Sequence, residues 1–306
     1  MTAKLIALDW GTSSLRAYLM SDSGQVIASR QSNEGIMKSD DFKAVLTHIT
    51  DGWEIGLPCI ACGMIGSQQG WADAGYIATP ASPTEISQKA IRIDALAGRS
   101  FTIIPGVKHA HANSIDVMRG EETQVIGAGV QNGLVVLPGT HSKWVSVSGG
   151  AIVSLRTYMT GEMFAVLKNH SILGRLIKAS ENVIDFDSAA FEKGAQLTLS
   201  NPAALMAELF SVRTHGLFGS IAATSLADYL SGLLLGAEIG LEKTGLSQAD
   251  PITLIGDAAL VARYEYAFKL ANINIAQQSN EPPDNVPAAA RGLFAIFAAS
   301  FFRPQA

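Results

Sequence analysis

The segment Leu5-Ile-Ala-Leu-Asp-Trp-Gly-Thr-Ser-Ser-Leu-Arg-Ala-Tyr-Leu19 decides how the N-terminal part of this chain folds. The apolar run 5–8 predicts a buried strand that ends at Asp9. A turn of small residues (11–13) leads into a second apolar strand over 15–20. The segment therefore predicts an antiparallel hairpin whose tip carries an acidic residue and small polar side chains.

The tip of this hairpin carries groups that can bind phosphate oxygens and a hydrated metal ion. Gly11 lets backbone N–H groups approach a ligand closely, and the hydroxyls of Thr12 and Ser13 add hydrogen-bond donors. Asp9 supplies the kind of carboxylate that holds Mg²⁺, usually through water. An ordinary hairpin tip favours the same small residues, so this segment alone leaves both interpretations open.

The composition bounds the class of protein. The chain has 306 residues, enough for two domains, and 48% of them are hydrophobic while 16% are charged. The formal net charge is −5 and basic runs are absent, which argues against nucleic acid or an anionic membrane as the main partner. The sequence shows no signal peptide, and its long apolar stretch 221–241 contains Asp228 and Glu238. We therefore expect a cytoplasmic protein with buried helices, and a homodimer is left open.

Two short motifs suggest metal or redox chemistry only weakly. Cys59 and Cys62 form a single C-x-x-C inside an apolar run, so we interpret both as core residues of a strand. His109 and His111 form an H-x-H without a third ligand at a matching spacing, and we interpret them as loop histidines.

The rest of the chain alternates predicted strands and helices. Strands are predicted over 26–29, 58–64, 101–105, 134–137, 145–148, 151–155, 252–255 and 273–276. Helices are predicted over 42–53 (capped by Asp40 or Asp41), within 81–93, and over 117–130, 162–169, 203–212, 220–243, 256–270 and 286–302. A turn is predicted at 282–284.

The pattern of the opening hairpin recurs later in the chain. The apolar run 134–137 is followed by Pro138-Gly-Thr-His-Ser-Lys-Trp144 and then by a second hairpin. This repetition predicts two domains of related plan, each presenting a phosphate-holding hairpin to a shared cleft. Gly139, Thr140 and Ser142 can cradle phosphate, and Lys143 adds a point charge.

Phosphoryl transfer to a hydroxyl also needs a base. Glu121 and Glu122 begin a predicted helix, and adjacent helical residues point in different directions, so only one of them is expected to face a ligand. Acids in the first turn of a helix also favour its dipole without any catalytic role, and that interpretation stays open. The turn 256–259 leaves room for a flat base or a ribose, or is an ordinary strand-to-helix turn.

Taken together, these motifs resemble those of a known family. LDWGTSSLRAYL resembles the first phosphate motif of the sugar kinase, hsp70 and actin superfamily, LPGTHSKWV its second phosphate motif, and LIGDAALVARY its adenosine motif. More narrowly, GMIGSQQGW, PGVK, DVMRGEETQ and TYMTGE are similar to segments of the 2-dehydro-3-deoxygalactonokinase family. The resemblance covers nearly the whole chain, with the motifs in order.

The resemblance implies an α/β fold of two actin-like (ribonuclease H-like) domains that flank a nucleotide- and sugar-binding cleft. The first domain would span 1–125 and the second 126–306, with the final helix, 287–303, packing back onto the first. The implied activity is ATP-dependent phosphorylation of the 6-hydroxyl of 2-dehydro-3-deoxy-D-galactonate in galactonate breakdown. Alternatives are a kinase for another keto-deoxy sugar acid or sugar, and a phosphohydrolase on the same fold.

The resemblance also implies roles for individual residues. ATP would be bound by the two phosphate motifs and the adenosine loop: Asp9, Gly11, Thr12, Ser13, Gly139, Thr140, His141, Ser142, Lys143, Gly256, Asp257 and Ala258. Asp9 would also hold Mg²⁺, and Glu121, with Glu122 in reserve, would be the base. The sugar acid would be bound by Ser67, Gln68, Gln69, Gly70, Trp71, Lys108 and Arg119. Gln68 departs from the basic residue usual at its position, so another cation must hold the substrate carboxylate: Arg16, Lys108, Arg119 or Arg156.

Overall fold

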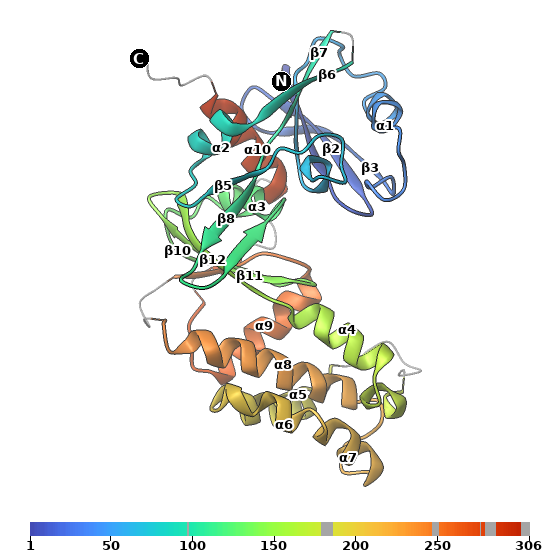
Figure 1. Ribbon diagram of the computed structural model, residues 1–306, viewed down its shortest axis with the longest axis vertical. Helices are drawn as coiled ribbons and strands as arrows, with labels where there is room; N and C mark the ends of the chain where they lie inside the picture. Colours follow the sequence, from blue (N-terminus) through green and yellow to red (C-terminus); the bar gives the residue numbers. More distant parts are fainter. Residues whose placement is uncertain (97, 179–185, 247–250, 276, 279–285, 301–306) are drawn as a thin grey trace. The chain divides into compact units, whose positions relative to one another are not determined.

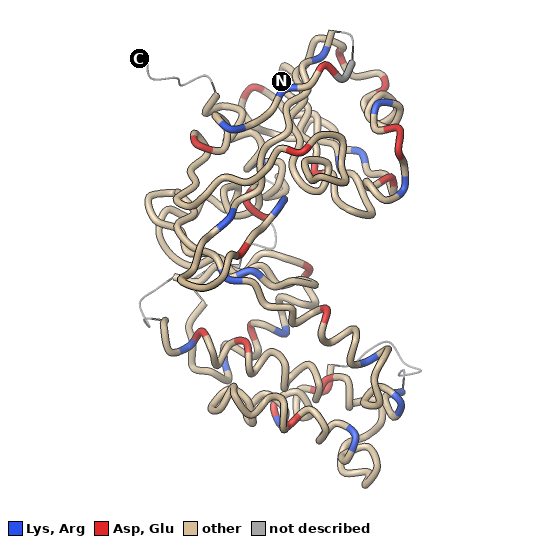
Figure 2. The backbone as a smooth tube through the Cα atoms, in the orientation of Figure 1, with Lys and Arg blue, Asp and Glu red and all other residues tan. Residues whose placement is uncertain are grey.

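The computed structural model describes residues 1–96, 98–178, 186–246, 251–275, 277–278 and 286–300 (Figure 1). The described residues form two compact units. Unit 1 contains those within Met1–Val135, Val145–Arg156 and Glu281–Ala306, and unit 2 contains those within Val136–Trp144 and Thr157–Asn280. Acidic and basic residues are interspersed along both units (Figure 2).

Unit 1 is built on a six-stranded mixed sheet. In their order across the sheet its strands are β3 (Val26–Ser32), β2 (Leu15–Ser21), β1 (Ala3–Trp10), β4 (Cys59–Cys62), β7 (Arg99–Ile103) and β6 (Ile91–Leu96). The predicted hairpin and the predicted strand after it form an antiparallel meander, with Ile6 opposite Leu19. From β1 to β7 the pairing is parallel, so β1 and β4 end at the same edge of the sheet.

Both faces of β1 are buried, which explains its unbroken apolar run. Ile6, Leu8 and Trp10 share one core cluster with helix α1 (Phe42–Ile49). Because side chains alternate along a strand, Leu5 and Ala7 lie on the opposite face. Helix α10 (Ala288–Ala299) packs against β1, β4 and the short helix α3 (Glu121–Gly127).

Several predicted boundaries in unit 1 are wrong for local reasons. Helix α1 has the predicted cap, since Asp41 accepts a hydrogen bond from the Ala44 N–H at 2.9 Å. It stops at Ile49 rather than at residue 53, and Gly52 follows with a φ of +72°. The predicted helix over 117–130 begins only at Glu121, because the preceding residues form a strand.

That strand belongs to a three-stranded sheet that the sequence pattern did not predict. The sheet consists of β5 (Tyr76–Ala78), β8 (Gly106–Ala110) and β9 (Ile115–Met118), in the order β5-β8-β9. Helix α2 (Pro83–Lys89) follows β5, within the region where a helix was predicted. His109 lies in β8 rather than in a loop, 2.7 Å from the Thr79 hydroxyl, and His111 lies 3.2 Å from the Asp116 carboxylate.

A second, five-stranded sheet has the order β12-β11-β10-β13-β14. Its strands are β10 (Asn132–Leu137), β11 (Ser142–Ser148), β12 (Ala151–Tyr158), β13 (Ile252–Leu254) and β14 (Gln277–Gln278). The predicted hairpin over 145–155 is confirmed. The strand predicted at 273–276 is displaced: residues 273–275 are not a strand, Ala276 lies outside the described residues, and β14 follows. The turn predicted at 282–284 also lies outside them.

Most residues of β10, β11 and β12 belong to unit 1, whereas β13 and β14 belong to unit 2 together with most of the remaining helices. The helices of unit 2 are α4 (Thr160–His170), α5 (Ser188–Leu199), α6 (Leu205–Glu208), α7 (Ser211–Leu217), α8 (Leu226–Lys243) and α9 (Ala258–Leu270). Unit 2 also contains 3-10 turns at Leu173–Leu176 and Pro202–Ala204, and unit 1 contains one at Met64–Gly66. The single helix predicted over 203–212 is broken into short pieces, and α8 begins at Leu226 rather than at residue 220. Helices α5 and α8 pack so closely that a Cβ on Gly232 would lie 2.0 Å from the Phe191 carbonyl oxygen. None of the helices in the described residues is long and apolar enough to cross a membrane.

Candidate active site

The tip of the β1–β2 hairpin is held by a neighbouring segment of unit 1. The Trp10 indole N–H donates to the Glu34 carbonyl at 3.0 Å, and the Ile36 N–H donates to the Gly11 carbonyl at 3.1 Å. Gly35 packs directly on the tip, where a Cβ would lie 2.4 Å from the Thr12 carbonyl oxygen. The side chains of Thr12 and Ser13 are exposed. The backbone is therefore fixed from one side, while the two hydroxyls face solvent.

Replacing Gly35 with alanine is expected to destabilise the protein by about 1–3 kcal/mol, because the new methyl group overlaps backbone atoms that cannot turn aside. The thermal melting temperature should fall, and activity should fall with it because the hairpin tip must shift. Gly56→Ala is the matched control, since a Cβ there would meet nothing within 4 Å. Equal melting temperatures for the two variants would contradict the packing argument.

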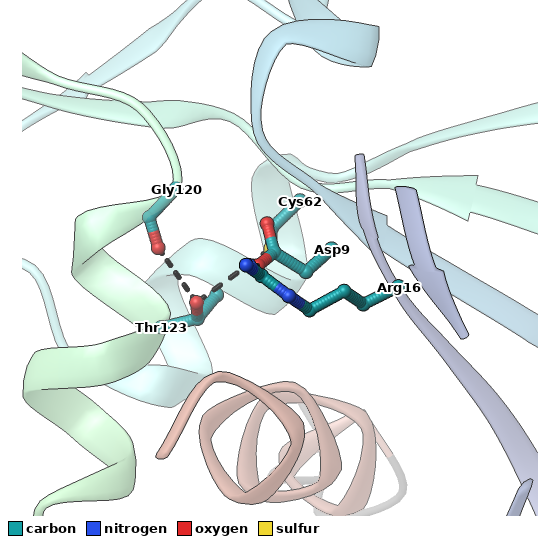
Figure 3. Close-up of polar contacts among 5 residues, drawn as sticks. All are labelled: Asp9, Arg16, Cys62, Gly120 and Thr123. Carbon is teal, nitrogen blue, oxygen red and sulfur yellow. Dashed lines mark hydrogen bonds and ion pairs between the residues drawn. The ribbon is translucent and has the colours of Figure 1, made fainter. Parts of the chain in front are cut away.

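Asp9 lies at the end of β1 in a small polar cluster (Figure 3). Its carboxylate is 3.3 Å from the Arg16 guanidinium, and the Cys62 thiol lies 3.9 Å from the other carboxylate oxygen. Burial raises the pKa of Asp9 and the charge of Glu121 raises it further, whereas Arg16 lowers it. Cys62 and Cys59 are free and buried, as predicted for core residues.

Glycine contacts bring the end of β1, the end of β4 and the start of α3 together. Gly63 follows β4 with a φ of +88°, and a Cβ there would lie 2.7 Å from the Trp10 carbonyl oxygen. Gly120 precedes α3 with a φ of +109°, and its Cβ would lie 3.4 Å from the Gly63 Cα. The Thr123 hydroxyl is 2.6 Å from the Gly120 carbonyl and 3.6 Å from the Cys62 sulfur (Figure 3). These contacts hold the acidic start of α3 beside Asp9.

The two adjacent glutamates at the start of α3 have different surroundings. Glu121 is partly exposed, and its carboxylate accepts a hydrogen bond from the Arg119 N–H at 3.0 Å. Glu122 is completely buried, and both of its carboxylate oxygens lie within 2.9 Å of the Gly120 N–H. Burial, together with the charge of Glu121, raises the pKa of Glu122 to about 8. Of the two carboxylates, that of Glu121 can therefore meet a ligand from solvent.

The buried Glu122 predicts a pH dependence of stability. Its pKa is about 8 in the folded protein against an ordinary value of 4.5, so the protonated form is favoured by folding. Its contribution to the free energy of unfolding is full below pH 4.5 and is lost as the pH rises through about 8. Glu122→Gln removes this titration.

The measurement is the melting temperature of wild type and of Glu122→Gln from about pH 5 to about pH 9. The wild type should lose stability relative to the variant as the pH rises, whatever their order at low pH. Titrating groups that do not interact with Glu122 are common to both proteins and cancel in the difference. A difference that stays constant across this range would contradict the prediction.

The segment 66–71, predicted to bind the sugar acid, follows β4 as a tight loop. The Arg119 guanidinium donates to the carbonyls of Gly66 at 2.5 Å and Gly75 at 2.9 Å, and lies 4.3 Å from the centre of the Tyr76 ring. Arg119 therefore holds this loop, although the sequence suggested that it contacts substrate.

The residues of this loop differ in exposure. Gln68 and Gln69 are exposed, whereas the Trp71 ring packs 5.1 Å from that of Phe101 in the core. Ser67 donates to the Met64 carbonyl at 2.7 Å, and a Cβ on Gly70 would lie 2.3 Å from the Ile65 carbonyl oxygen. Outside the loop, Lys108 is exposed on β8. The loop thus offers two side-chain amides to solvent, while its other members shape the turn.

In unit 2 the second phosphate motif divides into an exposed part and a buried part. Thr140 and His141 are exposed, and the His141 ring lies 2.5 Å from the Glu162 carboxylate. Ser142 is completely buried and donates to the Glu238 carboxylate at 2.8 Å, so its hydroxyl points away from solvent. Lys143 is also buried, with its ammonium 3.5 Å from the His141 carbonyl. Loop residues 139–141 are therefore those that present backbone and side chains to solvent.

The predicted adenosine loop lies beside this motif. A Cβ on Gly256 would lie 3.2 Å from the Pro138 carbonyl oxygen. Asp257 caps α9 by accepting hydrogen bonds from the N–H groups of Ala259 and Leu260, so its carboxylate is engaged at the helix N-terminus. Ala258 is the first residue of that helix.

A cavity of about 540 Å³ opens in unit 2 next to both loops. Gly139 and Leu260 line it, so it lies against the second phosphate motif and the helix after the adenosine loop. Lys168 and Lys178 add positive charge to its walls, and Arg263 also lines it but forms an ion pair at 2.6 Å with Asp228, another lining residue. The sequence did not predict these charged residues, because they lie outside any motif and become neighbours only through the packing of the helices.

Comparisons with known proteins agree on one family. The family model described as 2-keto-3-deoxy-galactonokinase matches residues 9–296. A protein of Escherichia coli (strain K12) named 2-dehydro-3-deoxygalactonokinase is 37% identical over 280 residues, which cover 90% of this chain and 92% of that protein. A crystal structure of a candidate 2-dehydro-3-deoxygalactonokinase from Sinorhizobium meliloti superposes with a TM-score of 0.88 at 35% identity, covering 98% of this chain and 100% of that one.

A more distant structure shows the fold alone. The activator of 2-hydroxyisocaproyl-CoA dehydratase from Clostridium difficile, solved with ADPNP bound, has a TM-score of 0.51 at 12% identity, covering 98% of this chain and 96% of that one. The predicted actin-like α/β fold is confirmed by these neighbours and by the sheets described above.

Proposed function

The chain belongs to the 2-keto-3-deoxy-galactonokinase family, and from this premise we propose that it is a kinase that transfers the γ-phosphoryl group of ATP to the 6-hydroxyl of 2-dehydro-3-deoxy-D-galactonate. The observation that carries the proposal is the partly exposed Glu121 at the start of α3, a helix that the Cys62–Thr123 and Gly63–Gly120 contacts hold beside Asp9. A base next to a metal-binding carboxylate is what transfer to an alcohol requires. The enzyme would act in the cytoplasm, where ATP is available.

The proposal assigns activation of the acceptor to unit 1. Glu121 would accept the proton of the 6-hydroxyl as the oxygen attacks phosphorus. Glu122 would stay in the core, because both of its oxygens face the Gly120 N–H. Gln68 and Gln69 would bind hydroxyl groups of the sugar acid, and the exposed Lys108 would bind its carboxylate. Arg119 would act indirectly, by holding the loop that carries the two glutamines.

Magnesium fits the residues at the end of β1. In phosphoryl transfer Mg²⁺ keeps several waters and needs only one or two protein carboxylates besides the phosphates. Asp9 offers such a carboxylate with part of its surface exposed, near the hydroxyls of the hairpin tip. When bound, the ion would neutralise charge on the phosphates. Arg16, at 3.3 Å from Asp9, would keep the carboxylate oriented.

The proposal assigns the nucleotide to unit 2. The N–H groups and side chains of 139–141 would bind phosphate oxygens, and the cavity beside Gly139 and Leu260 would hold the nucleoside. Lys168 and Lys178 would favour an anionic ligand there by their charge, whereas the charge of Arg263 is balanced by Asp228. Gly256 and Ala258 would shape the wall of the site, and Asp257 would fix it by capping α9.

An ATP-consumption assay over a panel of acceptors tests the proposal. The panel contains the galactonate and gluconate keto-deoxy acids, aldonates and hexoses, each with and without Mg²⁺. We expect kcat/KM to be highest for the galactonate keto-deoxy acid and to require the metal. Preference for another acceptor would identify a different sugar kinase, and phosphate release without any acceptor would identify a phosphohydrolase.

A further inference from the structure

Glu238 is a buried carboxylate that the proposed reaction does not use. It lies in α8 with 2% of its surface exposed. Four side chains donate hydrogen bonds to it: Ser142 at 2.8 Å, Trp144 at 2.7 Å, Tyr264 at 3.0 Å and Thr160. Burial raises the pKa of Glu238, and the four donors act in the opposite direction.

The four donors come from three elements, of which α4 and α9 line the proposed nucleotide cavity and β11 follows the phosphate loop. Ser142 and Trp144 begin β11, directly after the phosphate loop 139–141. Thr160 is the first residue of α4, and Tyr264 lies in α9; both also line the cavity. The carboxylate is therefore the common attachment point of β11, α4 and α9.

The start of α4, which Thr160 attaches to Glu238, also contacts the phosphate loop directly. Gly161, next to Thr160, packs so closely on the loop that a Cβ there would lie 2.3 Å from the Gly139 carbonyl oxygen. The Glu162 N–H donates to the Thr140 carbonyl at 2.9 Å. A shift of α4 relative to β11 would therefore move the loop, and Glu238 bonds to both elements.

A purely structural core position does not favour a carboxylate. Burying its charge is costly, and apolar side chains of similar volume often serve stability as well or better. An ionised carboxylate only accepts hydrogen bonds, so it makes several donors converge on one point. Donors that converge on one carboxylate fix the relative positions of the elements that carry them. A ligand site requires such fixed positions, whereas a hydrophobic core does not.

We propose that Glu238 is a positioning residue of the nucleotide site, which sets the geometry of the phosphate loop 139–141 by holding β11, α4 and α9 on one carboxylate. The inference rests on the proposed function in one respect, that unit 2 binds ATP. Glu238 acts through its four donors and does not touch the nucleotide.

Glu238→Gln is the informative variant, because the cluster can be rebuilt without the charge. The Trp144 indole can only donate, so the glutamine carbonyl must face it. The hydroxyls of Thr160 and Tyr264 can accept as well as donate, so they can receive the amide hydrogens. The variant should fold, but with weaker and differently directed hydrogen bonds around the phosphate loop.

The expected result is a rise of roughly tenfold in the KM for ATP, and an equal loss of affinity for ADP measured by calorimetry. The KM for the sugar acid should change by less than about twofold, because unit 1 is untouched. Trp144→Phe, which removes one donor and keeps an aromatic ring at the position that packs near Phe268, should shift the same constants in the same direction by less. If Glu238→Gln fails to fold, the same measurements on Trp144→Phe test the inference.

Thr198→Val is the control for a loss of buried polar contacts alone. Thr198 is completely buried in α5 and donates to the Leu233 carbonyl at 2.8 Å, away from the cavity lining. This variant should lose stability without a change in the KM for ATP. If Glu238→Gln binds ADP as tightly as wild type, or leaves the KM for ATP unchanged as Thr198→Val is expected to do, the inference is wrong. If wild type itself does not bind ADP or ATP, the proposed function fails first.

Discussion

Glu121→Gln is expected to lower kcat by roughly 10²–10⁴-fold, the usual contribution of a general base. The amide keeps the shape of the side chain and can still accept the Arg119 N–H through its carbonyl, but it cannot take a proton from the sugar hydroxyl. Affinity for ADP, measured by calorimetry, should not change, because the proposed nucleotide site lies in unit 2. The loss should therefore appear in kcat and not in the nucleotide binding constant.

Glu122→Gln is the matched control, since it changes the neighbouring residue in the same way. Its carboxylate is completely buried and faces the Gly120 N–H, so its kcat should stay within about tenfold of wild type. The reverse pattern, a large loss for Glu122→Gln and a small one for Glu121→Gln, would transfer the role of base to Glu122. Near-wild-type turnover of both variants would remove α3 from the chemistry.

Asp9→Asn is expected to raise the Mg²⁺ concentration needed for half-maximal activity by roughly 10–100-fold, as for residues that orient a metal through its waters. Asparagine has the same shape and can still accept a hydrogen bond from Arg16, but it carries no charge to attract the ion. The measurement is a titration of activity with Mg²⁺ at fixed ATP.

Cys62→Ala is the control for this titration. It removes the thiol that lies 3.9 Å from the Asp9 carboxylate and leaves the charge of Asp9 intact. Its Mg²⁺ requirement should match that of wild type even if its stability falls. An Asp9→Asn variant with an unchanged Mg²⁺ titration would exclude Asp9 from metal binding.

The sequence predicts best those elements whose residues are buried on both sides. Strand β1 has an unbroken apolar run because helices cover both faces of its sheet, and the glycine after Trp10 marks its turn. Strand β9 was missed for the opposite reason. Its apolar residues Ile115 and Val117 are 69% and 42% exposed, so the positions of its apolar residues in the sequence do not mark a buried face of the strand. The sequence pattern instead predicted that residues from 117 onward belong to the helix that begins at Glu121.

In the candidate site, features set by neighbouring residues in the sequence could be predicted, whereas features set by residues far along the chain could not. The different environments of Glu121 and Glu122 follow from helix geometry, and the sequence predicted that they would diverge. The direction of Ser142 could not be predicted, because its hydroxyl bonds to Glu238, a residue 96 positions later in the chain. The role of Arg119 as the support of the 66–71 loop likewise depends on contacts with residues 53 and 44 positions away.

Identification of the reaction product by NMR tests the central claim most directly. The enzyme is incubated with ATP, Mg²⁺ and 2-dehydro-3-deoxy-D-galactonate, and the product is examined for coupling between phosphorus and carbon. We expect a phosphate ester on C6, formed in equal amount to ADP. An ester on another carbon, or inorganic phosphate released whether or not the sugar acid is present, would contradict it.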